Sequence, residues 1–154
     1  MNRLLAFTRI LALALFLGGG AAIALIVAPA TFRILETDRA AAGAVVGRSL
    51  GIFEWVALAS TAAGFVASLA LRVRRAPSLV ADLALASLLA GSVYVHFLLA
   101  PAIRDARPAG TGAGTEFMRL HERYEQVFGF ELLLALAALY AATSPGNTAP
   151  AASK

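Results

Sequence analysis

The sequence contains no cysteine, few charged residues and only two histidines among its 154 residues. The absence of cysteine excludes disulfide bonds, thiolate metal sites and cysteine nucleophiles. Charged residues make up 14% of the chain, well below the ~25% typical of soluble domains. Hydrophobic residues make up 60%, and the mean hydropathy is +0.78. This composition excludes an ordinary water-soluble domain.

The sequence also lacks the common catalytic and nucleic-acid-binding patterns. It has no phosphate-binding loop, no HExxH motif and no serine beside a histidine base. We therefore predict no enzymatic activity, no cofactor and no resident metal, and a membrane enzyme is the least favoured alternative. The net charge of +4 does not predict nucleic-acid binding, because the arginines flank apolar runs and form no basic stripe with interleaved aromatics.

Four apolar runs predict an all-α integral membrane four-helix bundle. A helix needs about 20 apolar residues to cross the hydrocarbon core. The predicted spans are residues 4–32, 50–71, 79–103 and 127–143, within a membrane domain of residues 1–143, and residues 144–154 are predicted to be a disordered tail. The first run contains Arg9 and continues past any plausible cleavage site, which favours a retained span over a signal peptide.

Proline and glycine positions predict where the helices end. Pro29 and Pro101 are expected to end the first and third helices, because proline interrupts the helical hydrogen-bond ladder. Residues 40–75 contain no proline, which predicts one long helix that extends beyond the membrane. After a glycine-rich loop at 108–114, a second extended helix is expected to begin near Glu116.

The two halves of the chain resemble each other. A shift of 72 residues places Ala28-Pro29-Ala30 on Ala100-Pro101-Ala102, and a shift of 77 places Phe53-Glu54 on Phe130-Glu131. The difference of five residues falls in a connecting loop, where insertions are tolerated. The pattern fits two parallel two-helix repeats with a pseudo-two-fold axis along the membrane normal. Chance similarity between alanine-rich helices is the alternative.

Three ionisable side chains in the spans form a candidate polar site: Glu54, Glu131 and His96. Ionisable residues inside a membrane are candidates for proton or ion pathways. If they converge, they fit a proton or cation (metal) pathway. The alternative is structural, since both glutamates lie only four or five residues inside their spans and are able to extend to the interface or pair with nearby arginines.

Two further features predict helix packing. Arg9 and Asp82 fall near equivalent positions of the two halves, which predicts a structural ion pair between the first and third spans. Small residues four apart let membrane helices approach closely. Two such series occur, Gly43, Gly47 and Gly51 followed by Ser60, Gly64 and Ser68. The glycines of both series are therefore predicted packing positions, within the chain or in a homo-oligomer, and Glu54 and Thr61 share the face of Gly43.

The distribution of arginine predicts an orientation. Arg3 and the arginines at 72, 74 and 75 lie on the side of the N-terminus and of Lys154. The positive-inside rule places this side in the cytoplasm, although the other two loops also carry arginines, mixed with acidic residues. We predict a multi-pass membrane protein with both termini cytoplasmic.

Several motifs together resemble a known membrane family. These are Leu17-Gly18-Gly19-Gly20, Val27-Ala28-Pro29-Ala30-Thr31-Phe32, the stretch from Ala42-Gly43 to Gly47, and His121 before the last span. They resemble the bacterial branch of the transmembrane protein 205-like family, known as domain of unknown function 4149. The resemblance implies four spans, a location in a bacterial inner membrane and an unsettled activity, and it supplies no catalytic residues. A weaker similarity to copper-resistance and haem-pathway membrane proteins is not supported, because one intramembrane histidine is too few.

These features predict a structural or accessory membrane protein, with transport of protons or cations as the alternative. The expected partners are membrane lipid and either a second copy of the chain or another membrane protein. Convergence of Glu54, Glu131 and His96 around a cavity distinguishes the two hypotheses.

Overall fold

The computed structural model describes residues 2–73, 79–106 and 114–143. Three predicted features lie outside these residues: the loop except for Gly114 (108–113), the tail at 144–154, and the two arginines Arg74 and Arg75. The described part of the chain is helical, without strands: α1 Asn2–Ala22, η1 Ile23–Val27, α2 Ala28–Ile34, α3 Arg39–Val73, α4 Leu79–Tyr94, η2 Val95–Leu99, α5 Ala100–Asp105 and α6 Thr115–Thr143.

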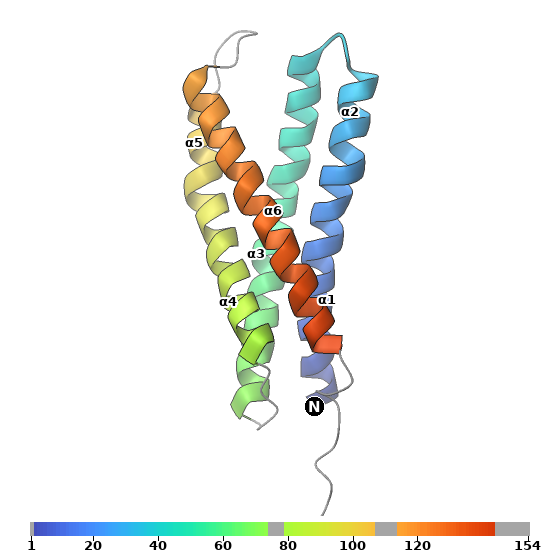
Figure 1. Ribbon diagram of the computed structural model, residues 1–154, viewed down its shortest axis with the longest axis vertical. Helices are drawn as coiled ribbons and strands as arrows, with labels where there is room; N and C mark the ends of the chain where they lie inside the picture. The colour runs from blue at the N-terminus through green and yellow to red at the C-terminus, as the bar shows by residue number, and fades with distance from the viewer. Residues whose placement is uncertain (1, 74–78, 107–113, 144–154) are drawn as a thin grey trace, which may run out of the picture.

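The helices form a four-helix bundle in which the chain runs up and down (Figure 1). α1 packs against α3 and α6, and α4 packs against the same two helices. The start of α1, the end of α3, the start of α4 and the end of α6 lie at one end of the bundle, drawn at the bottom of Figure 1. This arrangement is compatible with two related helix pairs, since exchanging α1 with α4 and α3 with α6 preserves the neighbours.

Pro29 and Pro101 do not end their helices, contrary to the prediction. Each lies in a helix that continues, to Ile34 and to Asp105, after a five-residue π-helical segment, η1 or η2. In each case the residue before proline donates its backbone N–H to a carbonyl five residues back: Ala28 to Ile23, and Ala100 to Val95. Within lipid every backbone group needs a partner, so the helix widens locally where proline removes a donor instead of stopping.

The side chains are distributed as expected for a protein surrounded by lipid. Large apolar side chains are exposed on the outside of the bundle, among them Leu25, Ile34, Val66, Leu133 and Tyr140. Charged and polar side chains are buried inside it, including Arg9, Glu54, Thr61, Asp82 and Glu131. Among the described residues, four helical stretches are long and apolar enough to cross a membrane: Asn2–Ile34, Arg39–Val73, Leu79–Asp105 and Thr115–Thr143. The protein is therefore a multi-pass membrane protein.

The second helix of each pair is longer than a membrane requires. α3 has 35 residues and α6 has 29. At 1.5 Å per residue these lengths correspond to roughly 52 and 44 Å, compared with a hydrocarbon core of about 30 Å. Both helices therefore extend beyond the core.

The predicted glycine positions differ in their packing. A Cβ atom on Gly64 would lie 2.6 Å from Ala12 Cβ and 3.0 Å from Leu85 Cδ2, so α1, α3 and α4 approach each other closely there. A Cβ atom on Gly43 or Gly51 would have no described neighbour within 4 Å, and Gly47 is exposed. The structure therefore does not place the first three glycines in packing within the chain, because the N-terminal part of α3 is only partly covered.

This difference gives a matched pair of substitutions. We expect Gly64→Ala to destabilise the bundle by about 1–3 kcal/mol, because the methyl group overpacks a closed contact. Gly43→Ala is expected to be neutral or slightly stabilising, because alanine favours a helix more than glycine does. Thermal unfolding of the purified protein in detergent, followed by circular dichroism, measures both effects. Equal midpoints for the two variants would contradict the assigned packing.

Candidate functional site

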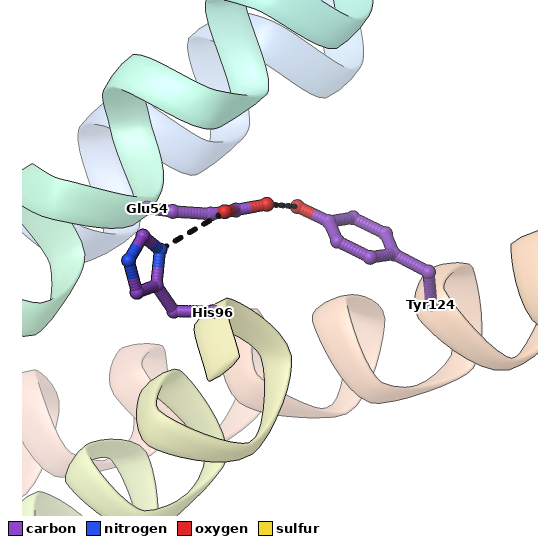
Figure 2. A network of polar contacts seen from close by, with 3 residues as sticks. All are labelled: Glu54, His96 and Tyr124. Atoms are coloured by element: carbon purple, nitrogen blue, oxygen red, sulfur yellow. Dashed lines mark hydrogen bonds and ion pairs between the residues drawn. The ribbon is translucent and has the colours of Figure 1, made fainter. Parts of the chain in front are cut away.

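Glu54 lies at the centre of a network formed by three helical segments (Figure 2). Its Oε2 atom lies 3.2 Å from His96 Nδ1, and its Oε1 atom accepts a hydrogen bond of 3.5 Å from the Tyr124 hydroxyl. Glu54 comes from α3, His96 from η2 and Tyr124 from α6. The side chain of Glu54 is only 8% exposed and that of His96 15% exposed. Glu54 therefore points into the bundle and not toward the headgroups.

Local structure positions the imidazole of His96. The residue lies in the π-helical turn that precedes Pro101, and such turns often occur at functional sites. Its ring packs edge-on against Trp55, with centroids 4.3 Å apart, and against Phe97, with centroids 4.7 Å apart. These contacts fix the ring with one nitrogen directed at Glu54, so the proline-induced turn determines the geometry of the pair.

Glu131 is buried next to the same network. It is 5% exposed, and its carboxylate occupies the space where a side chain at position 91 would begin, so glycine is required there. Glu54, Glu131, Ser92 and Tyr124 all line one small cavity of about 10 Å³, roughly the space that one water molecule needs. The two glutamates thus converge on a common cavity, and His96 joins them through Glu54.

The described side chains do not form the ligand cluster of a transition-metal site. No group of three or more histidine, aspartate or glutamate side chains that could hold a metal ion occurs within residues 2–73, 79–106 and 114–143. Zinc and similar ions require several such ligands around one point. The Glu54–His96 pair alone supplies two, which fits exchange of a proton better than retention of a transition metal.

The predicted Arg9–Asp82 ion pair is replaced by other contacts. Asp82 Oδ2 lies 3.2 Å from Arg72 Nε, and Asp82 Oδ1 accepts a hydrogen bond from the Ser68 hydroxyl. Arg9 is buried and interacts electrostatically with Asp82. However, its Nε and Nη1 atoms have no hydrogen-bond partner in the described part of the chain. Arg72 and Asp82 meet because α3 ends and α4 begins at the same end of the bundle.

Four residues of these networks were not predicted as polar partners: Tyr124, Ser92, Arg72 and Ser68. Two of them carry a signal in the sequence. Tyr124 precedes Glu131 by seven residues and Ser92 precedes His96 by four, which places each on the same helix face as a predicted site residue. Arg72 was interpreted only as one of the arginines that indicate the orientation. Its contact with Asp82 depends on how the two helices meet.

Comparison with known proteins identifies a family without an assigned activity. Neither the curated proteins nor the solved structures contain a match to this chain. The family model described as "Domain of unknown function (DUF4149)" matches residues 11–111. The matched region contains Glu54, Ser92 and His96 and ends before α6, which contributes Tyr124 and Glu131. Since the match covers more than half of the chain, the protein belongs to the DUF4149 family.

Proposed function

We propose that this membrane protein binds and transfers protons through its interior, using Glu54, His96 and Glu131. The observation that carries the proposal is the position of the Glu54 carboxylate, held between His96 and Tyr124 and lining the same cavity as Glu131. Carboxylate and imidazole groups exchange protons readily, and ionisable groups inside a membrane mark proton relays. The small cavity supports a proton over a larger substrate, and it supports a non-enzymatic role.

The contacts among the three side chains suggest the order in which they carry the proton. His96 is the most exposed member and is the natural point of proton entry. Glu54 contacts both His96 and Tyr124, and a single water molecule in the cavity is able to connect Glu54 to Glu131. A proton then passes from His96 to Glu54 and on to Glu131.

The test is proton flux in liposomes that contain the purified protein and a trapped pH-sensitive dye. Glu54→Gln keeps the size and a hydrogen-bond acceptor but removes the titratable group, so we expect flux to fall about a hundredfold or more, the range in which loss of a proton-transfer group lies. The matched control is Glu122→Gln, an exposed glutamate on α6. Flux unchanged in Glu54→Gln, with a folded protein, would end the relay proposal.

An accessory role is the second candidate. The observation in its favour is the glycine face of α3, where Gly43 and Gly51 have no close described neighbour and Gly47 is exposed. Such a face suits a second copy of the chain or another membrane protein. In this case the buried network only fixes helix packing, and Glu54→Gln lowers stability without changing flux. The liposome experiment therefore separates the two roles.

The location that fits both roles is a bacterial inner membrane with both termini in the cytoplasm. Its support is the positive-inside rule, because Arg3 and Arg72 lie at the end of the bundle where α1 begins (Figure 1). Membrane lipid is the expected partner around the bundle, and nucleic acid is not an expected partner.

A further inference from the structure

Glu131 and Ser92 each have a buried side-chain oxygen that accepts or donates no hydrogen bond among the described residues. Both are 5% exposed. Glu131 Oε1 and Ser92 Oγ find no hydrogen-bond partner anywhere in the part of the chain that the structure describes. Unpaired buried polar groups are costly, so native proteins almost always satisfy them with protein, water or an ion. Because both residues line the same cavity, one guest there is able to serve both.

The charges around the cavity favour a positively charged guest. His96 in η2 and Arg104 in α5 lie near Glu54 and act on its charge, and Tyr124 in α6 donates to it. Glu131 forms no ion pair with any side chain of the described residues. An ionised carboxylate buried without a counter-charge is strongly unfavourable, so Glu131 requires a cation or a proton.

The donor atoms and the size of the cavity define the class of cation. The polar lining consists of the carboxylates of Glu54 and Glu131 and the hydroxyls of Ser92 and Tyr124, all of them oxygen donors. Oxygen donors suit hard cations. A cavity of about 10 Å³ has room for one ion without a hydration shell. Since no cluster of three acidic or imidazole ligands is present among the described residues, a monovalent ion fits better than a divalent one.

We propose that this cavity binds one sodium ion, with Glu131 as the charged ligand and Ser92 as a neutral ligand. The proposal rests on the proposed proton relay, because it names the ion that occupies Glu131 when this carboxylate holds no proton. Binding at Glu131 is measured separately from flux through Glu54, so either proposal is able to fail while the other stands.

The test compares the thermal unfolding midpoint of the purified protein in sodium, potassium and choline chloride at constant ionic strength, at neutral and acidic pH. A ligand that binds only the folded state raises the midpoint, by an amount that grows with the logarithm of its concentration divided by its Kd. For a sodium site, we expect sodium to raise the midpoint by several degrees over choline. Glu131→Gln is expected to abolish this increase and Ser92→Ala to reduce it. The matched controls are Glu122→Gln and Ser49→Ala, whose side chains lie outside the cavity.

The other outcomes are equally informative. If sodium has no specific effect but acid stabilises the protein, Glu131 holds a proton on its own carboxyl group and the sodium site is overturned. Sodium stabilisation that survives Glu131→Gln also overturns it, because the charged ligand would then lie elsewhere.

Discussion

Asp82→Ala is expected to destabilise the folded bundle by about 3–5 kcal/mol, the usual cost of removing one partner from a buried charged cluster. Asp82 accepts a hydrogen bond from Ser68, contacts Arg72 Nε at 3.2 Å and exerts its charge on Arg9. Arg9 is 7% exposed and has two nitrogens without a hydrogen-bond partner among the described residues. Removing Asp82 therefore leaves a buried guanidinium without its nearest negative charge. Unfolding in a series of detergent and SDS mixtures, followed by circular dichroism, measures the loss.

Two further variants identify which arginine matters. The side chain of Arg72 is 51% exposed, so its ion pair with Asp82 is screened by solvent, and Arg72→Gln is expected to cost less than about 1 kcal/mol. Arg9→Met in the Asp82→Ala background is expected to recover part of the stability, because it removes the uncompensated charge. A large loss in Arg72→Gln together with no recovery by Arg9→Met would show that Arg72, and not Arg9, is the important partner.

The spans were predictable because lipid imposes strong rules on sequence. Each apolar run had to be a helix long enough to cross the hydrocarbon core, and each predicted span lies within a helix of the structure. The effect of proline was predicted incorrectly. In water a helix often stops at such a residue, whereas at Pro29 and Pro101 the backbone continues through a π-helical turn. The two turns are 72 residues apart, since Ile23 plus 72 is Val95, which matches the shift found in the sequence.

The polar site was predictable only along each helix. Helical periodicity identifies which residues share one face of a single helix, and it therefore placed Glu54 on an inward face. Which side chains meet across helices depends on rotation, tilt and register, which the sequence does not specify. For this reason Tyr124 was missed as a partner of Glu54, and Arg72 was missed as a partner of Asp82. The same limit explains the glycines: their spacing is regular, but only Gly64 lies where three helices converge.

Gly91→Ala is expected to destabilise the protein by about 3 kcal/mol, the upper end of the range for overpacking. A methyl group at position 91 would occupy the place of the buried Glu131 carboxylate. The carboxylate has little room to move, because the adjacent cavity measures about 10 Å³ and is lined by Phe16, Phe53 and Phe128. Either α4 and α6 separate or the carboxylate turns away from Ser92, and both changes disturb the proposed relay. We therefore expect reduced proton flux and a lower unfolding midpoint in the same variant.

A double-mutant cycle tests whether this effect comes from Glu131. Glu131→Ala removes the group with which the new methyl collides, so the Gly91→Ala/Glu131→Ala variant is expected to be more stable than the sum of the single losses predicts, by about 1–2 kcal/mol. Gly64→Ala is the control, because its Cβ atom would lie 2.6 Å from Ala12 Cβ and 3.0 Å from Leu85 Cδ2, and neither residue lines the cavity with Glu131. Glu131→Ala is therefore expected to add to Gly64→Ala without coupling. Additive losses for Gly91 and Glu131 would mean that the carboxylate does not lie against Gly91, and the cavity would then lose its charged ligand.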